Sequence, residues 1–426
     1  MKFIFEDKNN LLNFTKCEDI NTSGIRRFGL SPLLNASHLL FVSNQLGNPH
    51  TFCETNEDVE NYIITAGVNH SPEDWTGYNP KVKSVFSHLN EKYLRDLRNG
   101  KAVLLLDQSF EGYHTPWLFE WFHGECNEWN INPKYVVYVT GNMIVDDVYD
   151  NWCIENNITE KMKVIGYSHF EYDMGTTAYH KSSTNEHLPT FNENLQYKID
   201  HLDGIKTYTC LNKRIREHRV WFYYYLYHSG LLDKGLVSMN KFDTHWYNWE
   251  GRFFENIEEL EEINNTLPRM VYNKPNNELD DNFYINRFPE QVVKDTFFTI
   301  VSEAHCGDSN QTMFLSEKTF KVIACRHPFM IMGNKDSMKM MRKIGYKTFD
   351  GFIDEGYDSL PTHERLNYII ESIRKIDEMK DKIEWYKSTK EIVEYNYNKL
   401  IYKILQVPVE FIELENYTNK LFNEKK

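Results

Sequence analysis

Short, continuous apolar runs recur along the chain, and most are followed by polar residues and then by apolar residues at helical spacing. Continuous runs of this kind are typical of strands in parallel sheets, which are buried on both faces. Their alternation with helical segments predicts an α/β chain built from Rossmann-like repeats. The predicted strands lie at residues 2–5, 39–43, 62–64, 103–106, 135–139, 162–168, 205–211, 236–239, 297–301, 329–333 and 347–349.

Apolar residues spaced three and four apart predict the helices. In the helix after residue 219, Val220, Tyr224 and Tyr227 share one side. Residues 173–204 are polar and irregular, and we interpret them as partly a lid and partly a connection between domains. The aromatic, acidic insertion at 241–265 has no register that the pattern fixes. Further helices are predicted at residues 82–97, 146–156, 317–327, 337–345, 362–376, 377–400 and 411–421.

The chain of 426 residues is too long for one ordinary core, so two domains of similar size are expected. The pattern places an N-terminal Rossmann-like domain at 1–190 and a second one at 191–400. A helical tail, 401–426, follows them.

Composition narrows the class of protein. Apolar residues make up 41% of the chain, yet no apolar run approaches the length of a membrane span, so a protein of the cytoplasm without membrane contact is expected. The formal charge of −14 argues against a general nucleic-acid-binding protein. The seven cysteines form no CxxC pair and are expected to be reduced and structural. No glycine-rich phosphate loop, HExxH, DxD or Cys/His cluster occurs, so no metal or other cofactor is predicted.

The most informative stretch is in the second half. The strand at 297–301 leads to Glu303, a polar loop follows, and Ser316 caps a helix whose first turn holds Glu317 and Lys318. Loops at the carboxyl ends of parallel strands are where such folds bind ligands, and a cation beside free N–H groups suits a diphosphate. A carboxylate there suits sugar hydroxyls. A plain serine-capped helix start explains the same residues equally well.

A second basic cluster follows the strand at 205–211. It contains Lys213, Arg214, Arg216 and Arg219 at a strand-to-helix junction. Cations are poorly placed at the start of a helix, whose dipole favours anions there. A bound diphosphate is the preferred explanation, and a solvated basic turn is the alternative.

Polar residues also follow the buried run 103–106 in the first half. Asp107, Glu111 and His114 come just beyond it, where α/β folds place their chemistry. Each is a candidate general base, and for Glu111 a structural role is an equal alternative.

The run FLSEKTFKVIACRHPFMIMG, residues 314–333, resembles the donor-site signature of the fucosyltransferase-like GT-B glycosyltransferases, in which a Phe/Tyr-x-Thr/Ser-Glu-Lys helix start precedes a Pro-x-x-x-Gly strand. Glu303 occupies the place of an acidic residue that ends the preceding strand in that family, and Phe314 stands where a tyrosine often lies. The chain departs from the family at Ala304, where asparagine is usual, and in a longer loop before Ser316.

The resemblance implies two Rossmann-like domains facing across a cleft and a C-terminal helix that crosses back to the first domain. It also implies that an arginine of the first donor-domain helix contacts diphosphate, and that a hexosyl or pentosyl group is transferred with inversion and without a metal. Glu111, supported by Asp107 and His114, is then the expected base. The donor is a nucleotide sugar, with UDP-linked and GDP-fucose donors both open.

The signature is common in phage-encoded transferases, so the acceptor is expected to be a glycan or a hydroxymethylated base of phage DNA, in a host cytoplasm. Two other classes stay open. One is an inactive sugar-nucleotide-binding or glycan-binding protein of this fold, and the other is a nucleotide-sugar isomerase or epimerase. The oligomeric state is not predicted.

Overall fold

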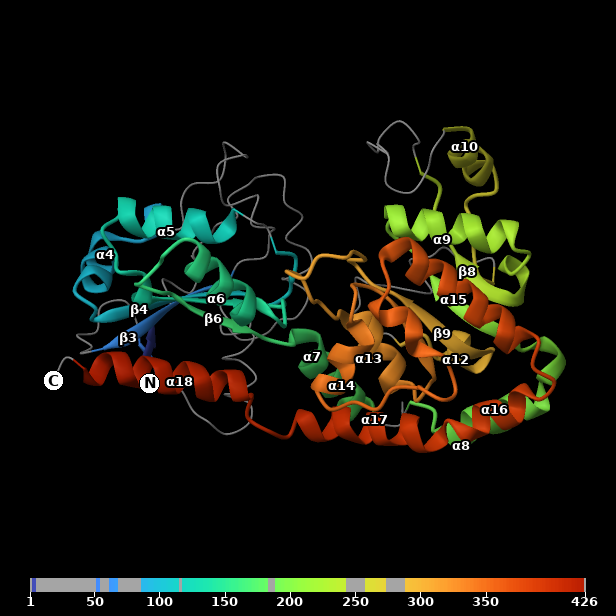
Figure 1. The fold of residues 1–426 in the computed structure, drawn as a ribbon. Helices are drawn as coiled ribbons and strands as arrows, with labels where there is room; N and C mark the ends of the chain where they lie inside the picture. Colours follow the sequence, from blue (N-terminus) through green and yellow to red (C-terminus); the bar gives the residue numbers. More distant parts are fainter. Residues whose placement is uncertain are drawn as a thin grey trace. The chain divides into compact units, whose positions relative to one another are not determined.

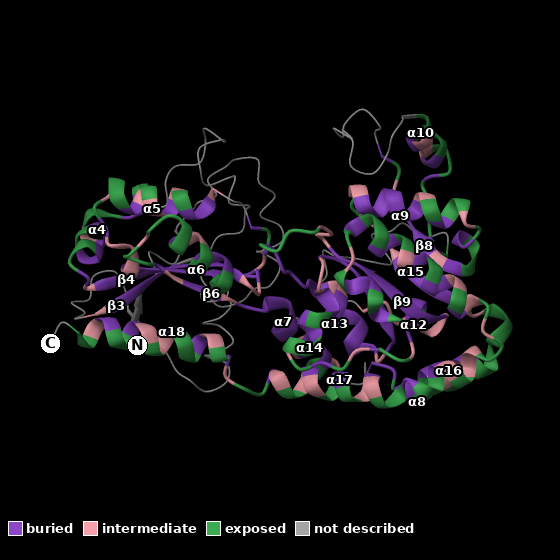
Figure 2. Cartoon of the chain, in the orientation of Figure 1, coloured by how far each residue is buried: buried purple, intermediate pink, exposed green. Residues whose placement is uncertain are grey.

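The computed structural model describes residues 2–4, 51–53, 61–67, 86–114, 117–182, 188–242, 257–272 and 288–424. Its contacts divide the chain into two compact units. The first unit consists of Met1–His169, Gln311–Phe314 and Leu405–Lys426, and the second of Phe170–Asn310 and Leu315–Ile404. Each unit is organised around a parallel sheet, and the strand residues whose burial is described are mostly buried (Figures 1 and 2).

The sheet of the first unit has six parallel strands in the order β2-β1-β3-β4-β5-β6. Every residue of β4 and β5 is buried, as the continuous apolar runs predict. The strands are β1 (Lys2–Ile4), β2 (Thr51–Cys53), β3 (Tyr62–Gly67), β4 (Ala102–Gln108), β5 (Val136–Thr140) and β6 (Lys163–Gly166). The helices are α4 (Glu91–Arg98), α5 (Leu118–Glu128), α6 (Val145–Glu155) and α18 (Val409–Asn423), with short 3₁₀ turns at Phe86–His88 and Pro133–Tyr135.

The C-terminal helix α18 belongs to the first unit, although the chain reaches it from the second. Its buried face carries Phe411, Leu414 and Leu421, at the spacing that predicts it. The hydroxyl of Tyr417 on the same helix donates a hydrogen bond to the carbonyl of Lys134 at 2.9 Å. The predicted return of the C-terminal helix to the first domain is therefore confirmed.

The sheet of the second unit has four parallel strands in the order β10-β9-β7-β8. The strands are β7 (Lys206–Leu211), β8 (Gly235–Ser238), β9 (Thr296–Ser302) and β10 (Phe329–Met332). The helices are α7 (His169–Ser182), α8 (Phe191–Asp200), α9 (Glu217–His228), α10 (Ile257–Asn265), α12 (Glu290–Lys294), α13 (Glu317–Ala324), α14 (Ser337–Lys343), α15 (Thr362–Asp377), α16 (Lys382–Ser388) and α17 (Lys390–Lys403), with 3₁₀ turns at Leu202–Gly204, Leu232–Lys234 and Glu355–Ser359.

Two crossovers of the second unit run in opposite directions from the middle of its sheet. Helix α9 joins β7 to β8 on one side, and α13 joins β9 to β10 on the other. Because such connections are right-handed, the two helices cover opposite faces, as Figure 1 shows. The strand order therefore reverses between β7 and β9, which is where open α/β sheets bind ligands.

These features confirm the predicted fold class, an α/β protein of GT-B type with two Rossmann-like units. The contact division falls between His169 and Phe170, earlier than the predicted boundary near residue 190, because α7 and α8 pack with the second unit. No helix in the described part of the chain is long and apolar enough to cross a membrane. The five cysteines whose side chains are described are free thiols, and four of them are buried.

The interpretation of residues 173–204 as a lid and connection is wrong for the part that the structure describes, which forms α7 and α8. Thr190 and Glu193 form a capping box that starts α8. The segment looks irregular in sequence because polar side chains are buried in it: the amine of Lys198 donates to the carbonyls of Val293 and Lys294 at 2.8 and 2.9 Å. Residues 183–187 lie outside the described part.

A smaller prediction is also wrong. Residues 347–349 are not a strand, because the side chain of Asn396 takes the place of a neighbouring strand and bonds both the N–H and the carbonyl of Lys347. The helix predicted after residue 219 is present as α9, and its buried residues include Val220, Phe222 and Tyr223, whereas Tyr227 is 39% exposed. The predicted strand at 39–43, residues 82–85 and residues 243–256 of the insertion lie outside the described residues.

Candidate functional site

The candidate site of the second unit lies where the loops after β7 and β9 begin. These adjacent parallel strands end at Leu211 and Ser302. The basic cluster 213–219 follows the first strand, and Glu303 follows the second. The topology thus brings both predicted motifs to the point where the strand order reverses.

Glu303 is completely buried, and its carboxylate is held from several directions. One oxygen accepts hydrogen bonds from the backbone N–H of Ser316 at 3.1 Å and the hydroxyl of Thr319 at 2.6 Å. The other accepts from the hydroxyl of Ser316 at 2.5 Å and the N–H of Ala304 at 3.3 Å. Glu303 therefore fixes the start of α13 to the end of β9, and in this structure its carboxylate bonds the protein itself.

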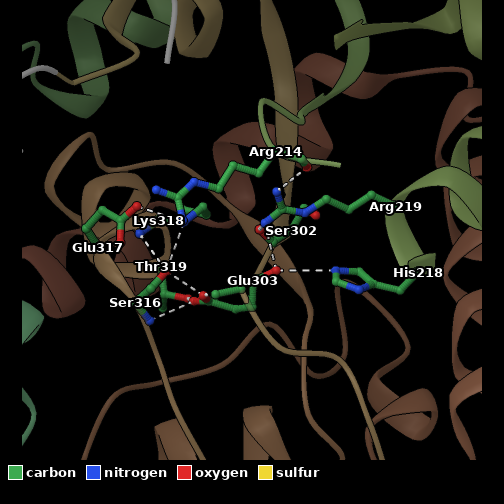
Figure 3. Close-up of polar contacts among 10 residues, drawn as sticks. Arg214, His218, Arg219, Ser302, Glu303, Ser316, Glu317, Lys318 and Thr319 are labelled. Carbon is green, nitrogen blue, oxygen red and sulfur yellow. Dashed lines mark hydrogen bonds and ion pairs between the residues drawn. The ribbon is translucent and has the colours of Figure 1, made fainter. Parts of the chain in front are cut away.

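Arg219 plays a similar part for the preceding loop. Arg219 is 3% exposed, and its guanidinium donates to the carbonyls of Arg214, Ser302 and Glu303 at 2.9, 3.1 and 2.9 Å. The ring of His218 lies 3.3 Å from the same Glu303 carbonyl. Figure 3 shows Arg219 and His218 reaching the Glu303 backbone from one side, while Ser316 and Thr319 reach its carboxylate from the other.

The first turn of α13 is charged and largely buried. Ser316 is its N-cap and accepts a hydrogen bond from the N–H of Lys318 at 3.4 Å, as the sequence predicts. The amine of Lys318 forms an ion pair of 2.7 Å with Glu317. Burial alone would raise the pKa of Glu317, but Lys318 and Lys321 outweigh it and lower that pKa to about 2. Glu317 is therefore ionised at neutral pH.

Arg214 and Arg216 differ from Arg219 in exposure and in partners. Arg214 is exposed and Arg216 is half-buried. Among the residues that the structure describes, no carboxylate pairs with either guanidinium. Arg216 is the N-cap residue of α9 but makes no capping bond, and in Figure 3 the Arg214 side chain extends toward Glu317 and Lys318. Lys213 is half-buried beside them, with its carbonyl bonded by Asn240 at 2.8 Å.

His305 lies among these cations and was not selected by sequence analysis. Burial lowers the pKa of His305, and the charges of Arg216, Arg219 and Lys318 lower it further, to about 4. Its side chain is half-buried in the loop after β9. The only signal in the sequence is its position two residues after Glu303.

The loop beyond His305 is fixed to helix α15. Asp308 accepts hydrogen bonds from the N–H and hydroxyl of Thr362 at 3.0 and 2.7 Å, and it pairs with Arg365 at 3.2 Å. Arg365 is completely buried and also donates to the carbonyl of Gly307 at 3.2 Å. Sequence analysis missed this support, because the partners are more than fifty positions apart.

The predicted base candidates of the first unit lie at the end of β4. Asp107 is 4% exposed and accepts from the N–H of Ser109 at 2.9 Å. Glu111 is half-buried, and its carbonyl accepts from the N–H of Gly141 at 2.8 Å and the hydroxyl of Thr140 at 3.0 Å. Glu111 therefore stands on a turn that is tied to the end of the neighbouring strand β5.

His114 is buried, with its ring 4.9 Å from that of Phe119 between centroids. Burial lowers the pKa of His114 to about 4, so the ring is neutral at physiological pH. Its backbone N–H donates to the hydroxyl of Thr312 at 3.1 Å.

Phe314 belongs to the first unit, together with the three residues before it, whereas Leu315 belongs to the second. A Cβ added at Gly112 or Gly141 would lie 2.3 or 2.6 Å from its ring, so only glycines leave room for that ring. The side chain of Asn142 bonds the carbonyl of Gln311 at 2.7 Å and the N–H of Met313 at 2.9 Å. The loop between Glu303 and Ser316, which is longer than in the fucosyltransferase-like family, thus supplies a segment of the first unit. A donor-binding role for Phe314 stays a prediction.

Within the described residues, no group of three or more His, Cys, Asp or Glu side chains is arranged to hold a metal ion.

Comparisons with known proteins give only distant similarities. No family model and no curated protein matches the sequence. An alpha,alpha-trehalose-6-phosphate synthase from Burkholderia multivorans is similar in structure, with a TM-score of 0.43 and 9% identity over 91% of this chain and 74% of that one. A UDP-forming alpha,alpha-trehalose-phosphate synthase from Burkholderia vietnamiensis also has a TM-score of 0.43 and 9% identity, over 90% of this chain and 78% of that one.

Proposed function

We propose that this protein is a glycosyltransferase that uses a nucleoside-diphosphate sugar, and that its second unit binds the donor. The observation that carries the proposal is the pair Arg214 and Arg216, which have no carboxylate partner in the described part of the chain. They stand at the reversal of strand order, beside a helix start that no side chain caps. Two unpaired cations and a helix N-terminus are the groups that bind phosphate.

The surrounding residues give each group a role. Arg214, Arg216 and Lys318 bind the diphosphate, and the ionised carboxylate of Glu317 accepts hydrogen bonds from ribose hydroxyls. Glu303 and Arg219 hold the two loops in place. Negative charge develops on the nucleoside diphosphate as it leaves, and fixed cations stabilise that charge without a metal.

Glu111 is the proposed base. Of the three candidates after β4, Asp107 and His114 are buried, whereas Glu111 is half-buried on an ordered turn. Glycosyl transfer has an oxocarbenium-like transition state, and an acceptor hydroxyl attacking opposite the leaving group needs a proton acceptor. An inverting transfer to a hydroxyl of a glycan, or of a hydroxymethylated base of phage DNA, is the corresponding reaction.

Nucleotide binding tests the donor site. Isothermal titration with UDP, GDP and CDP should identify one nucleotide that binds the wild type. Arg214→Ala and Arg216→Ala should each weaken its binding by about 10- to 100-fold, the equivalent of one charge-assisted hydrogen bond. Arg374→Ala is the matched control, because Arg374 lies in the last turn of α15, away from the site. Asp377 at the end of this helix bonds Thr207 at the start of β7, whereas the site follows the end of that strand. Equal affinity in all four proteins would contradict the proposed site.

Turnover tests the reaction. The wild type should release nucleoside diphosphate from the matching sugar nucleotide, slowly to water and faster with an acceptor. Glu111→Gln should keep the nucleotide affinity and lose the release. Binding without any release in the wild type would favour an inactive binding protein, and an altered sugar nucleotide without release would favour an isomerase or epimerase.

A further inference from the structure

A short segment of the loop after β9, Gln311–Phe314, belongs to the first unit, although the residues on either side of it belong to the second. The loop that follows β5 fixes its backbone. The side chain of Asn142 bonds the carbonyl of Gln311 at 2.7 Å and the N–H of Met313 at 2.9 Å. The N–H of Met143 donates to the carbonyl of Met313 at 2.8 Å. The segment is therefore anchored in the first unit by its backbone.

The ring of Phe314 lies against the turn Gln108–His114, which carries the proposed base Glu111. Phe314 is 4% exposed. An added Cβ at Gly112 would lie 2.3 Å from its Cδ2 atom, and one at Gly141 would lie 2.6 Å from its Cε2 atom. Since these two atoms are neighbours in the ring, one edge of the ring faces both glycines. Gly112 follows Glu111 in the chain, and the N–H of Gly141 donates to the carbonyl of Glu111 at 2.8 Å.

The same segment also holds the end of the turn. Near the start of the turn, the N–H of Glu111 donates to the carbonyl of Gln108 at 3.0 Å. At its end, the N–H of His114 donates to the hydroxyl of Thr312 at 3.1 Å. Because Thr312 and Phe314 lie in one segment, that segment contacts the turn both beside Glu111 and three residues after it.

We propose that Phe314 is a positioning residue for glycosyl transfer: its ring holds the turn that carries Glu111, and with it the proposed base, in one place. This inference rests on the proposed function, in which Glu111 removes the proton of the acceptor hydroxyl. It gives Phe314 a role in the first unit, which differs from the donor contact that the resemblance implies.

The physical reason is the precision that a general base requires. A base must lie within hydrogen-bond reach of the hydroxyl that it deprotonates, and a displacement of about 1 Å can lower a rate by about 100-fold. Gly112 and Gly141 have no side chains with which to fill the space beside the turn, and the ring of Phe314 fills it. In Phe314→Leu the Cε2 atom that faces Gly141 is absent, so the turn can shift while its hydrogen bonds remain.

Phe314→Leu tests this role, and Phe411→Leu is the matched control. Phe411 is also a buried phenylalanine of the first unit, on α18. Tyr417 of that helix bonds the carbonyl of Lys134, just before β5 begins, whereas the turn with Glu111 follows the carboxyl end of the neighbouring parallel strand β4. Both substitutions remove part of a buried ring and should lower the melting temperature of the full chain to a similar extent.

Two quantities are measured for each variant that a thermal melt shows to be folded. One is the affinity for UDP, GDP and CDP by calorimetric titration. The other is the rate at which nucleoside diphosphate is released from UDP-glucose, GDP-fucose and CDP-glucose. If Phe314→Leu is not folded, Thr312→Val takes its place, because it removes only the hydroxyl that accepts from the N–H of His114.

Phe314→Leu should bind the nucleotide within about twofold of the wild-type affinity and release it from the sugar about 10- to 100-fold more slowly. Phe411→Leu should match the wild type in both quantities. In Glu111→Gln the base is already absent, so adding Phe314→Leu should slow release no further. A merely structural role of Phe314 would instead slow release by the same factor with and without the base.

Wild-type release by Phe314→Leu, or a loss that multiplies with that of Glu111→Gln, would overturn the role of Phe314 and leave the proposed function intact. Weaker nucleotide binding by Phe314→Leu would also overturn it and would favour the donor contact. Release at the wild-type rate by Glu111→Gln would refute the base, and the positioning role with it. If the wild type binds none of the nucleotides and releases none from their sugars, the proposed function itself is refuted.

Discussion

Replacing Glu303 by glutamine separates a structural role from a ligand-binding role for this residue. Glutamine has nearly the same volume but only one acceptor oxygen and no charge. In the wild type one carboxylate oxygen accepts from Ser316 N–H and Thr319, and the other accepts from the Ser316 hydroxyl and from Ala304 N–H. If the amide oxygen of the new glutamine takes the place of the oxygen that accepts from Ser316 N–H and Thr319, the NH₂ group faces the N–H of Ala304. Two hydrogen-bond donors then oppose each other.

The cost can be estimated from these contacts. Hydrogen bonds to a charged acceptor contribute about 1.5–3 kcal/mol each, and the one to Ala304 is long at 3.3 Å. We therefore expect Glu303→Gln to lower the free energy of unfolding of the second unit by about 2–4 kcal/mol. For a unit of this size that corresponds to a fall of roughly 5–12 °C in its melting transition.

Urea unfolding of the second unit measures this loss, and a double-mutant cycle with Thr319→Val assigns it. Thr319→Val removes one hydroxyl that donates to Glu303 at 2.6 Å and should cost about 1–2 kcal/mol by itself. The two losses should not add, because both residues belong to one network. If Glu303→Gln keeps wild-type stability but loses nucleotide binding, the reasoning fails and Glu303 is a donor ligand, as the sequence first suggested.

Four other predictions follow from the same contacts. Gly112→Ala should cost the first unit about 1–3 kcal/mol, because the new Cβ would lie 2.3 Å from Phe314; Phe314→Leu should recover part of the loss in a thermal melt. Arg219→Ala should cost the second unit about 2–4 kcal/mol in urea, because three carbonyls lose their donor. Burial, and then the charge of Glu317, raises the pKa of Asp173 to about 7. The stability that the neutral form of Asp173 contributes is therefore present below its ordinary pKa of 3.8 and is lost as the pH rises through about 7. Urea unfolding midpoints at pH ~5 and ~8 should accordingly differ less in Asp173→Asn than in the wild type. Glycosyl transfer should continue in excess EDTA, since fixed cations neutralise the leaving group, and an activity that EDTA abolishes and Mg²⁺ restores would contradict it.

The strands could be predicted from sequence because strands buried on both faces require continuous apolar runs, as residues 103–106 and 297–301 show. Their ends could be predicted for the same reason, since the first polar residue after a buried strand marks where it reaches the edge of the sheet. Helix α13 was recognisable from its serine cap and Pro328. These signals are local, so a window of sequence contains them.

Elements that depend on distant partners could not be predicted in this way. The amine of Lys198 is buried because the carbonyls of Val293 and Lys294 accept its hydrogen bonds, and nothing near Lys198 in sequence announces them. Residues 347–349 have the composition of a strand, but the side chain of Asn396 bonds the backbone of Lys347 instead. The segment 311–314 likewise joins the first unit through Asn142, which lies far from it in the chain.

The same limit applies to the candidate site. The sequence placed four cations in the loop after β7 but could not say which of them are used internally. Arg219 lies in the first turn of α9, where its guanidinium meets the carbonyls at the end of β9, whereas Arg214 precedes the helix and is exposed. Residue type and spacing identified the location, and the three-dimensional partners decide the role.

That division of roles has an energetic consequence for binding. A cluster of cations is costly to hold together, and long basic side chains lose entropy when a ligand orders them. Here the carbonyls that bond Arg219, together with the buried carboxylate of Glu303, fix the loop that carries Arg214 and the first turn of α13 that carries Lys318. A diphosphate then orders only the ends of side chains whose backbone is already in place, which lowers the cost of binding. The buried charges therefore contribute to affinity without touching the ligand, and a substitution that loosens them should weaken binding as well as stability.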